Sequence, residues 1–218
     1  MGWRHALPFQ RDFLSSLTLI CVIFHTRRLP HWEPTDAEFF VTWRLFGSSP
    51  KAAHGAAPHL AEQVSAGAAF VAFDRRLDCA VNGPLWLKNP IVANLVRGVL
   101  LAGASEWRLY ELSAWVVMPN HVHVLIRPLV PLGKALMNIK SASAREANAV
   151  LERTGKPFWQ DESYDHFVRN DRERAAIIRY IHFNPVKAGL VKEPEDWPWS
   201  SMAAHGAAPH PILHSLEV

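Results

Sequence analysis

The stretch that decides the fold reads WVVMPNHVHVLI at residues 115–126. Apolar and β-branched residues on both sides of Met118-Pro119-Asn120 predict two antiparallel strands, at 107–117 and 121–127, joined by a tight turn. Side chains alternate between the faces of a strand, so His121 and His123 leave one face while the valines and the isoleucine between and after them face a core. Two imidazoles on one rigid strand can bind a divalent metal that takes one or two further ligands, although a His-x-His triplet alone is a weak signal.

The chain around this hairpin alternates between strand-like and helix-like patterns. An aromatic and β-branched run at 39–46 predicts a first strand, and a strand-like segment surrounds Tyr164. Apolar residues at helical spacing predict helices, the last of which should be ended by Pro185, at 60–78, 90–104, 131–154 and 171–183. This order predicts an α+β fold in which an antiparallel sheet has its helices packed on one face.

A second polar pattern lies at the end of the last expected helix, in YIHFNP at 180–185. Residues four apart share a helix face, so Tyr180 and Asn184 should project together. Because Asn184 precedes a proline, we expect it at the helix end, with an amide oxygen that can accept a hydrogen bond or bind a metal. The alternative is that Tyr180 is a core aromatic residue and Asn184 a capping residue.

Composition indicates an ordinary globular chain. The 218 residues include 23 Lys and Arg against 20 Asp and Glu, a net charge of +3 that permits nucleic-acid binding without requiring it. Two cysteines are too few for a disulfide framework, so a reducing cytoplasm is expected. The apolar run at 17–24 has eight residues, far fewer than the roughly 20 of a membrane helix, and no small-residue cleavage site follows it.

One sequence, AAHGAAPH, occurs twice, at 52–59 and 203–210. It lacks the fixed period and apolar pattern of a solenoid repeat and cannot form a core by itself. We expect two flexible surface segments; the alternative is a histidine-rich metal-binding tract.

Four blocks together resemble one family. The run at 115–126 resembles the signature of single-tyrosine HUH transposases, where U is a hydrophobic residue. Three further blocks resemble the REP-associated tyrosine transposases of the insertion sequence 200/605 type: FWQDESYDHFVRN (158–170), YIHFNPVKAGLV (180–191) and DWPWSS (196–201). The resemblance covers 27–201, with a low-complexity insertion near 50–59. It leaves 1–26 as an irregular leader and 202–218 as a flexible tail.

The resemblance implies a fold and a chemistry. It implies a ferredoxin-like antiparallel sheet of the HUH endonuclease type and a transposase that cuts and rejoins single-stranded DNA at palindromic hairpins. His121 and His123 match the metal-binding pair, Asn184 stands where relatives place a third ligand, and the metal would be Mg²⁺ or Mn²⁺. Tyr180 matches the nucleophile, which would form a 5′-phosphotyrosine link. Relatives act as monomers or homodimers.

Several roles remain open on the sequence. Tyrosine ordinarily has a pKa near 10, and neither His182 nor Lys187 is assigned as the base that would deprotonate Tyr180. Tyr164 is a rival nucleophile, for which packing is the preferred interpretation. His166 could approach the metal site or DNA, or make a structural hydrogen bond. The DNA-binding candidates are the basic residues Lys140, Arg145, Arg169, Arg179 and Lys187.

Two alternative functions share the metal site. One is a domesticated DNA-hairpin-binding protein that no longer cuts, and the other is a metal-dependent nuclease that uses water and leaves Tyr180 structural. The tryptophans at 197 and 199 could stack on bases, although sealing a core is the preferred interpretation.

Overall fold

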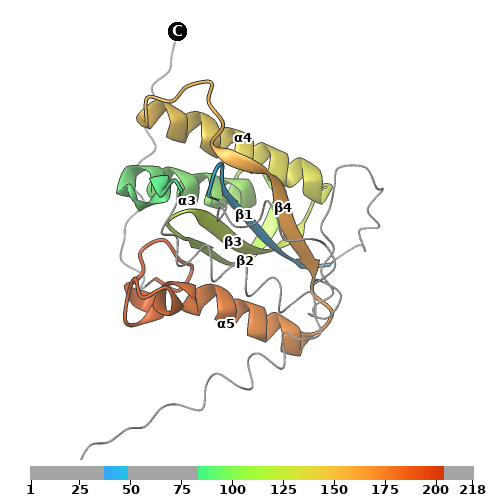
Figure 1. Cartoon of the computed structure of the whole chain (residues 1–218). Coiled ribbons are helices and arrows are strands. Elements are labelled where there is room, and N and C mark those ends of the chain that lie inside the picture. The colour runs from blue at the N-terminus through green and yellow to red at the C-terminus, as the bar shows by residue number, and fades with distance from the viewer. Residues whose placement is uncertain (1–36, 49–82, 204–218) are drawn as a thin grey trace, which may run out of the picture.

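The computed structural model describes residues 37–48 and 83–203 (Figure 1). The strands are β1 (Phe39–Leu45), β2 (Tyr110–Val117), β3 (His121–Pro128) and β4 (Trp159–Phe167). The α-helices are α3 (Pro90–Ser105), α4 (Leu132–Val150) and α5 (Asp171–Lys187), with short 3₁₀ helices η3 (Trp86–Lys88) and η4 (Pro194–Asp196). None of these helices is long and apolar enough to cross a membrane.

The four strands form one antiparallel sheet in the order β2-β3-β1-β4. With α3 before β2 and α4 before β4, this is the ferredoxin-like arrangement of strands and helices. The predicted α+β fold and its antiparallel sheet are therefore confirmed. The strands at 39–46 and 121–127 and the helix at 90–104 were predicted to within one residue of their observed bounds.

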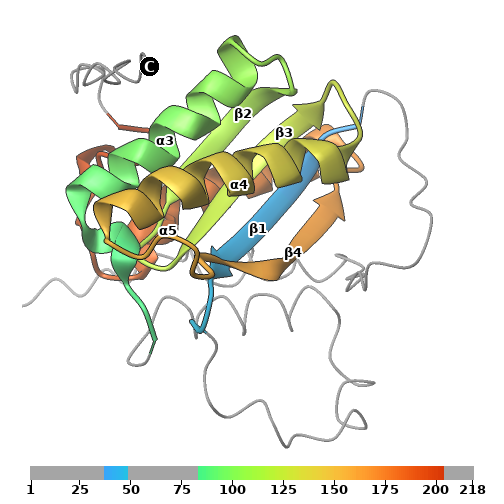
Figure 2. The same cartoon turned by 90° about the horizontal axis from the view of Figure 1, so that it is seen from above.

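The helices pack on both faces of the sheet, which corrects the expectation of one covered face. Figure 2 shows α3 and α4 side by side over one face, and Figure 1 shows α5 against the opposite face. On the α3/α4 face the core contains the inward residues of β3, Val122, Val124 and Ile126, as predicted. On the α5 face a smaller core includes Leu125 and Ile181. Apolar periodicity identifies the buried side of a helix but not the sheet face that it covers.

Helix α5 continues through Pro185 to Lys187, which corrects the expected end at Phe183. A proline near the C-terminus removes only one hydrogen bond of the helix, and the Ala188 N–H still donates to the Asn184 carbonyl at 3.0 Å. The helix ends instead just before Gly189, whose φ of +69° is the left-handed conformation common just after helices.

The two edges of the sheet are covered differently. Beside β2, the segment after η4 pairs through the bridge between Val116 and Ser200. The Trp197 indole donates to the Val117 carbonyl at 3.0 Å and the Trp199 indole to Asn94 at 3.1 Å, which agrees with a role in sealing the core. Beside β4, the Lys140 ammonium donates to the carbonyls of 160 and 161 at 2.8 and 2.9 Å. The paired edge beside β2 resists pairing with other chains.

Several expectations concern other parts of the chain. The leader at 1–26, the insertion near 50–59, the helix at 60–78 and nearly all of the tail at 202–218 lie outside the described residues. Their assignments stay predictions, as do the domain bounds 27–201.

Candidate active site

The paired histidines lie on β3, on the sheet face that α5 covers. Both side chains are fully buried, and their Nε2 atoms are 3.0 Å apart. Their rings are nearly perpendicular, with centroids 4.6 Å apart. The period-two expectation that both imidazoles leave one face is therefore confirmed.

Helix α5 brings its predicted polar pair to the same place. The Asn184 Nδ2 group lies 3.2 Å from His123 Nε2, and the Tyr180 ring lies 5.6 Å from the His123 ring, centroid to centroid. Tyr180 is 5% exposed and Asn184 is fully buried. Asn184 lies within the helix rather than at its end, because Pro185 does not interrupt α5. The four-residue spacing thus places both residues beside the histidines.

Three further residues that sequence reasoning missed complete the surroundings. Thr42 on β1 contacts His123 Nδ1 through its hydroxyl at 2.7 Å, and Asn120 in the β2–β3 turn contacts His121 Nδ1 through its amide oxygen at 2.6 Å. Phe40 stacks on the His123 ring at 5.6 Å and meets the Tyr180 ring edge-on at 5.9 Å. The available signal was the alternation of β1, which places Phe40 and Thr42 on one face.

The hydrogen-bond partners determine where the imidazole lone pairs lie. An amide oxygen only accepts, so His121 Nδ1 carries the hydrogen and His121 Nε2 carries a lone pair. The Asn184 amide donates to His123 Nε2, which therefore also carries a lone pair, while His123 Nδ1 donates to Thr42. Two lone pairs 3.0 Å apart repel each other unless a cation lies between them.

This donor set suits a divalent metal. Neighbouring ligands at right angles around an octahedral ion lie about 3.0 Å apart when each is about 2.1 Å from the metal, which agrees with the separation of the two Nε2 atoms. Among the described residues, no group of three His, Cys, Asp or Glu side chains could hold a metal. Asn184, whose amide lies beside His123, carries an oxygen that can serve as a third ligand.

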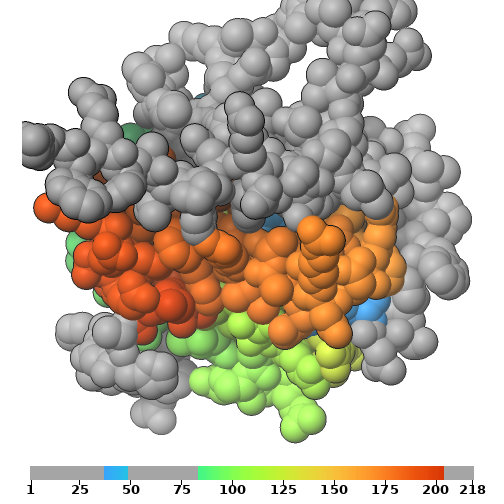
Figure 3. All heavy atoms as spheres, turned by 90° about the horizontal axis from the view of Figure 1, so that it is seen from below, coloured from blue at the N-terminus to red at the C-terminus, as the bar shows by residue number. Residues whose placement is uncertain are grey.

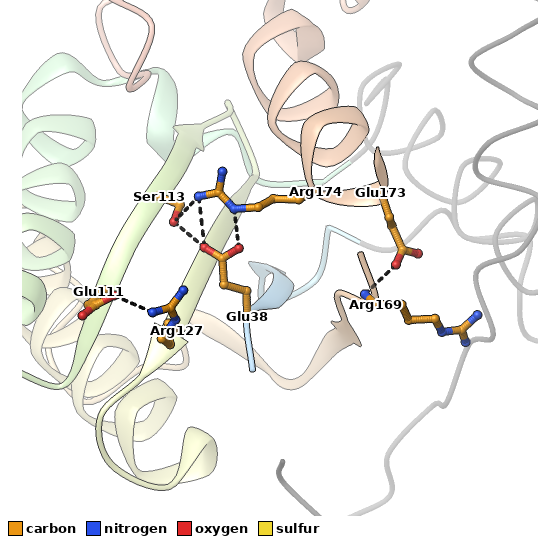
Figure 4. Close-up of polar contacts among 7 residues, drawn as sticks. All are labelled: Glu38, Glu111, Ser113, Arg127, Arg169, Glu173 and Arg174. Atoms are coloured by element: carbon orange, nitrogen blue, oxygen red, sulfur yellow. Dashed lines mark hydrogen bonds and ion pairs between the residues drawn. The ribbon is translucent and has the colours of Figure 1, made fainter. Parts of the chain in front are cut away.

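A partly buried ionic cluster holds the first half of α5 on the sheet (Figure 4). Arg174 donates from Nε to Glu38 and from Nη2 to the Ser113 hydroxyl at 3.1 Å, and Ser113 also donates to Glu38. Burial alone would raise the pKa of Glu38, but the hydrogen bonds from Arg174 and Ser113 and the charges of Arg174 and Arg127 together lower it. Because Arg174 and Tyr180 share α5, this cluster helps to position the tyrosine.

Comparison with known proteins finds relatives of one type. Residues 89–184 match the family described as "Transposase IS200 like". A REP-associated tyrosine transposase from Escherichia coli (strain K12) is 34% identical over 96 residues, which are 43% of this chain and 55% of that protein. The predicted resemblance is confirmed.

Two further relatives extend the comparison. A Haemophilus influenzae protein whose name assigns it provisionally to the same type is 29% identical over 105 residues, 42% of this chain and 58% of that protein. The chain thus spans little more than half the length of the curated relatives it matches. A solved structure, "Structure of the REP associates tyrosine transposase bound to a REP hairpin", superposes with a TM-score of 0.52. It covers 80% of this chain and 82% of that one at 20% identity, so it supports the shared fold.

Tyr164 is the second tyrosine near the paired histidines. It lies on β4, and its ring meets the Phe40 ring edge-on at 6.1 Å. Burial, with the negative charges of Asp165 and Glu173, raises the pKa of Tyr164 well above its usual value of 10. A raised pKa disfavours the phenolate, so packing is the better interpretation for this residue.

His166 makes the structural hydrogen bond that was one of its two alternatives. Its Nε2 lies 2.9 Å from the carboxylate of Glu173 on α5, and the side chain is buried. Burial lowers the pKa of His166, and the neighbouring Glu173 opposes that shift. The contact joins β4 to the first turn of α5.

The two groups considered as bases for Tyr180 have different contacts. His182 lies 2.9 Å from the Ser201 hydroxyl, and burial lowers its pKa. The Lys187 ammonium lies over the Tyr180 ring, 4.1 Å from its centroid. Residues seven apart are two helical turns apart and share a face. That spacing could have indicated from the sequence that Lys187 lies beside Tyr180.

The predicted DNA-binding residues lie on two sides of the molecule. Arg179 and Lys187 are exposed on α5, and Arg169 is exposed just before it. Figure 3 shows α5 and the segment after it, in orange and red, as the surface of this face. Lys140 and Arg145 lie on α4, on the opposite face of the sheet. The structure therefore places Arg169, Arg179 and Lys187 on the Tyr180 side of the sheet, and Lys187 contacts the Tyr180 ring.

Proposed function

We propose that this chain is a transposase that cuts and rejoins single-stranded DNA at hairpin sites through a covalent link to Tyr180. The observation that carries the proposal is the position of the Tyr180 ring, 5.6 Å from the ring of His123. A nucleophile beside paired imidazoles is the arrangement that phosphodiester transfer needs. A cytoplasmic location goes with this proposal, since the reaction needs access to DNA.

In the proposed cleavage step, the Tyr180 phenolic oxygen attacks phosphorus. A bond forms between the tyrosine oxygen and phosphorus, and the bond from phosphorus to the 3′ oxygen breaks. The phenol loses a proton, and the departing 3′ oxygen gains one and becomes a 3′-hydroxyl. The covalent link keeps the phosphodiester energy, so a second 3′-hydroxyl can reverse the step at another site without a nucleotide cofactor.

His121, His123 and Asn184 would hold Mg²⁺ or Mn²⁺ in this proposal. The metal, when bound, would polarise the scissile phosphate and stabilise negative charge in the transition state. Two imidazole ligands favour Mn²⁺ in affinity, while oxygen ligands suit either ion. The protein's own contribution is to hold the imidazoles and the tyrosine in fixed positions around one phosphate.

The DNA partner would be a single strand with a hairpin. Support comes from the solved structure of a REP-associated tyrosine transposase bound to a REP hairpin, which shares this fold. We propose that Arg169, Arg179 and Lys187 contact the strand near Tyr180, because they lie on the same side of the sheet. Arg179→Ala should weaken binding and reduce the slope of affinity against salt by about 1. Arg145→Ala, measured in parallel, tests the predicted contact on the far face, where Lys140 also lies.

The experiment that tests the proposal uses labelled hairpins from the DNA that flanks the gene. Protein, DNA and Mn²⁺ or Mg²⁺ are mixed, and denaturing gels show whether label migrates with protein. We expect a metal-dependent adduct that Tyr180→Phe abolishes and that Tyr164→Phe, the matched control, retains.

The other outcomes separate the alternatives. Shortened DNA without an adduct would show a nuclease that uses water. Binding without cleavage under both metals would show a domesticated hairpin-binding protein. An adduct that persists in Tyr180→Phe would disprove the role of this tyrosine.

A further inference from the structure

We propose that Thr42 and Asn120 are positioning residues that fix both site histidines in the tautomer whose Nε2 atoms bind the metal. The inference rests on the proposed function and deepens it, because it concerns how the metal-binding pair is prepared. It identifies two residues outside the quartet of His121, His123, Tyr180 and Asn184.

Backbone hydrogen bonds fix the turn that carries Asn120. Its backbone carbonyl accepts a hydrogen bond from the Leu45 N–H at 2.8 Å, at the end of β1, and the Met118 N–H donates to the His121 carbonyl at 2.9 Å across the turn. The side chain is 1% exposed, and its amide oxygen lies 2.6 Å from His121 Nδ1. The turn therefore presents a fixed acceptor, which selects the Nδ1–H tautomer of His121.

Thr42 holds His123 from a different strand, and its hydroxyl accepts from Nδ1 because the Asn184 amide already donates to Nε2. It lies on β1, paired with β3 on one side and with β4 on the other, and its register partner on β3 is His123. The side chain is 5% exposed, and its hydroxyl lies 2.7 Å from His123 Nδ1. A strand paired on both edges cannot shift easily, so the hydroxyl is a rigid partner.

The consequence is a pair of Nε2 atoms, 3.0 Å apart, that both carry lone pairs before any metal arrives. Without these partners an imidazole can exchange tautomers or rotate. Part of the free energy of metal binding is then used to order the ring again. Outer partners of metal-binding histidines typically contribute 10- to 100-fold to metal affinity. We expect the same range for Thr42→Val and Asn120→Ala, measured as the Kd for Mn²⁺.

The test measures Mn²⁺ binding to the full chain by electron paramagnetic resonance of free Mn²⁺, without DNA. Thr42→Ser and Asn120→Asp keep an acceptor at the same place. The Kd of these variants for Mn²⁺ should stay within a few-fold of the wild-type value. Ser143→Ala is the matched control, since Ser143 is a buried hydroxyl that accepts from the Trp159 indole at 2.9 Å on the α4 side of the sheet. It should leave the Kd unchanged.

A second readout needs no metal. Long-range ¹H–¹⁵N spectra of the metal-free protein report which ring nitrogen carries the hydrogen. The wild type should show His121 and His123 with hydrogen on Nδ1, and Asn120→Ala should lose that preference at His121 while Asn120→Asp keeps it. Circular dichroism confirms that each variant is folded.

The outcomes separate this inference from the proposed function. If the wild type binds no Mn²⁺, the metal site itself is wrong. If the wild type binds Mn²⁺ and Thr42→Val and Asn120→Ala bind it equally well, the positioning role is overturned. A wild type with hydrogen on Nε2 of His121 would overturn it as well.

Discussion

Replacing Arg174 with methionine should loosen the helix that carries Tyr180. The substitution keeps much of the apolar stem and removes three hydrogen bonds, two to Glu38 and one to Ser113. Glu38 is 8% exposed and would remain as a buried carboxylate without its hydrogen-bonded cation. Removing one partner of a buried ion pair leaves such a charge uncompensated, which is strongly destabilising.

The size of the effect follows from exposure. A hydrogen bond to a charged group contributes about 1.5–3 kcal/mol when buried. The Arg174 side chain, however, is 40% exposed, so solvent screening lowers the total. We expect the free energy of unfolding to fall by about 2 kcal/mol at pH 7, and the midpoint of thermal unfolding by about 4–8 °C for a chain of this size.

The pH dependence checks the cause. The folded-state pKa of Glu38 is lowered from its ordinary 4.5, so its ionised form stabilises the fold above pH 4.5 and this contribution is lost as the pH falls through the lowered value. The difference between wild type and Arg174→Met should therefore shrink in acid. Urea unfolding at pH 7 and at successively lower pH measures it. Arg172→Met, an exposed arginine on the same helix, is the control, and equal midpoints for the two variants at pH 7 would refute the reasoning.

Two further substitutions test contacts at other places. Lys187→Met should slow adduct formation by about 2- to 30-fold, because the ammonium over the Tyr180 ring favours the phenolate. Lys187→Arg should keep most of the rate, and an unchanged rate in the methionine variant would contradict this role. Gly103→Ala should cost about 1–3 kcal/mol in urea unfolding, since an added Cβ would collide with the Tyr110 hydroxyl. Gly133→Ala, where a Cβ meets nothing within 4 Å, should instead be neutral or stabilise by up to about 1 kcal/mol.

Local rules predicted the parts of the site that depend on spacing within one element. The period of two along β3 placed His121 and His123 on one face, and the helical spacing placed Tyr180 with Asn184. Both rules act over a few residues and do not depend on the rest of the fold.

The contacts that were missed join distant segments. Thr42 and His123 are 81 positions apart, and only the register of β1 against β3 makes them partners. The same limit explains why α5 was expected on the wrong face, because nothing in its own apolar pattern identifies the side of the sheet it covers. Pro185 was read as a stop, whereas a proline near the last turn costs little and Gly189 ends the helix.

The two halves of the site have different mechanical supports. The histidines and their Nδ1 partners, Thr42 and Asn120, lie on β1, on β3 and in the turn between β2 and β3, all within one hydrogen-bonded sheet. Tyr180 lies on a helix docked by side chains: Arg174 on Glu38, and apolar contacts that include Phe40. A variant that loosens α5 should therefore displace Tyr180 and Asn184 while leaving the paired imidazoles, two of the three proposed metal ligands, in place. Losing Arg174 should slow adduct formation more than it weakens Mn²⁺ binding, whereas losing Thr42 should do the reverse.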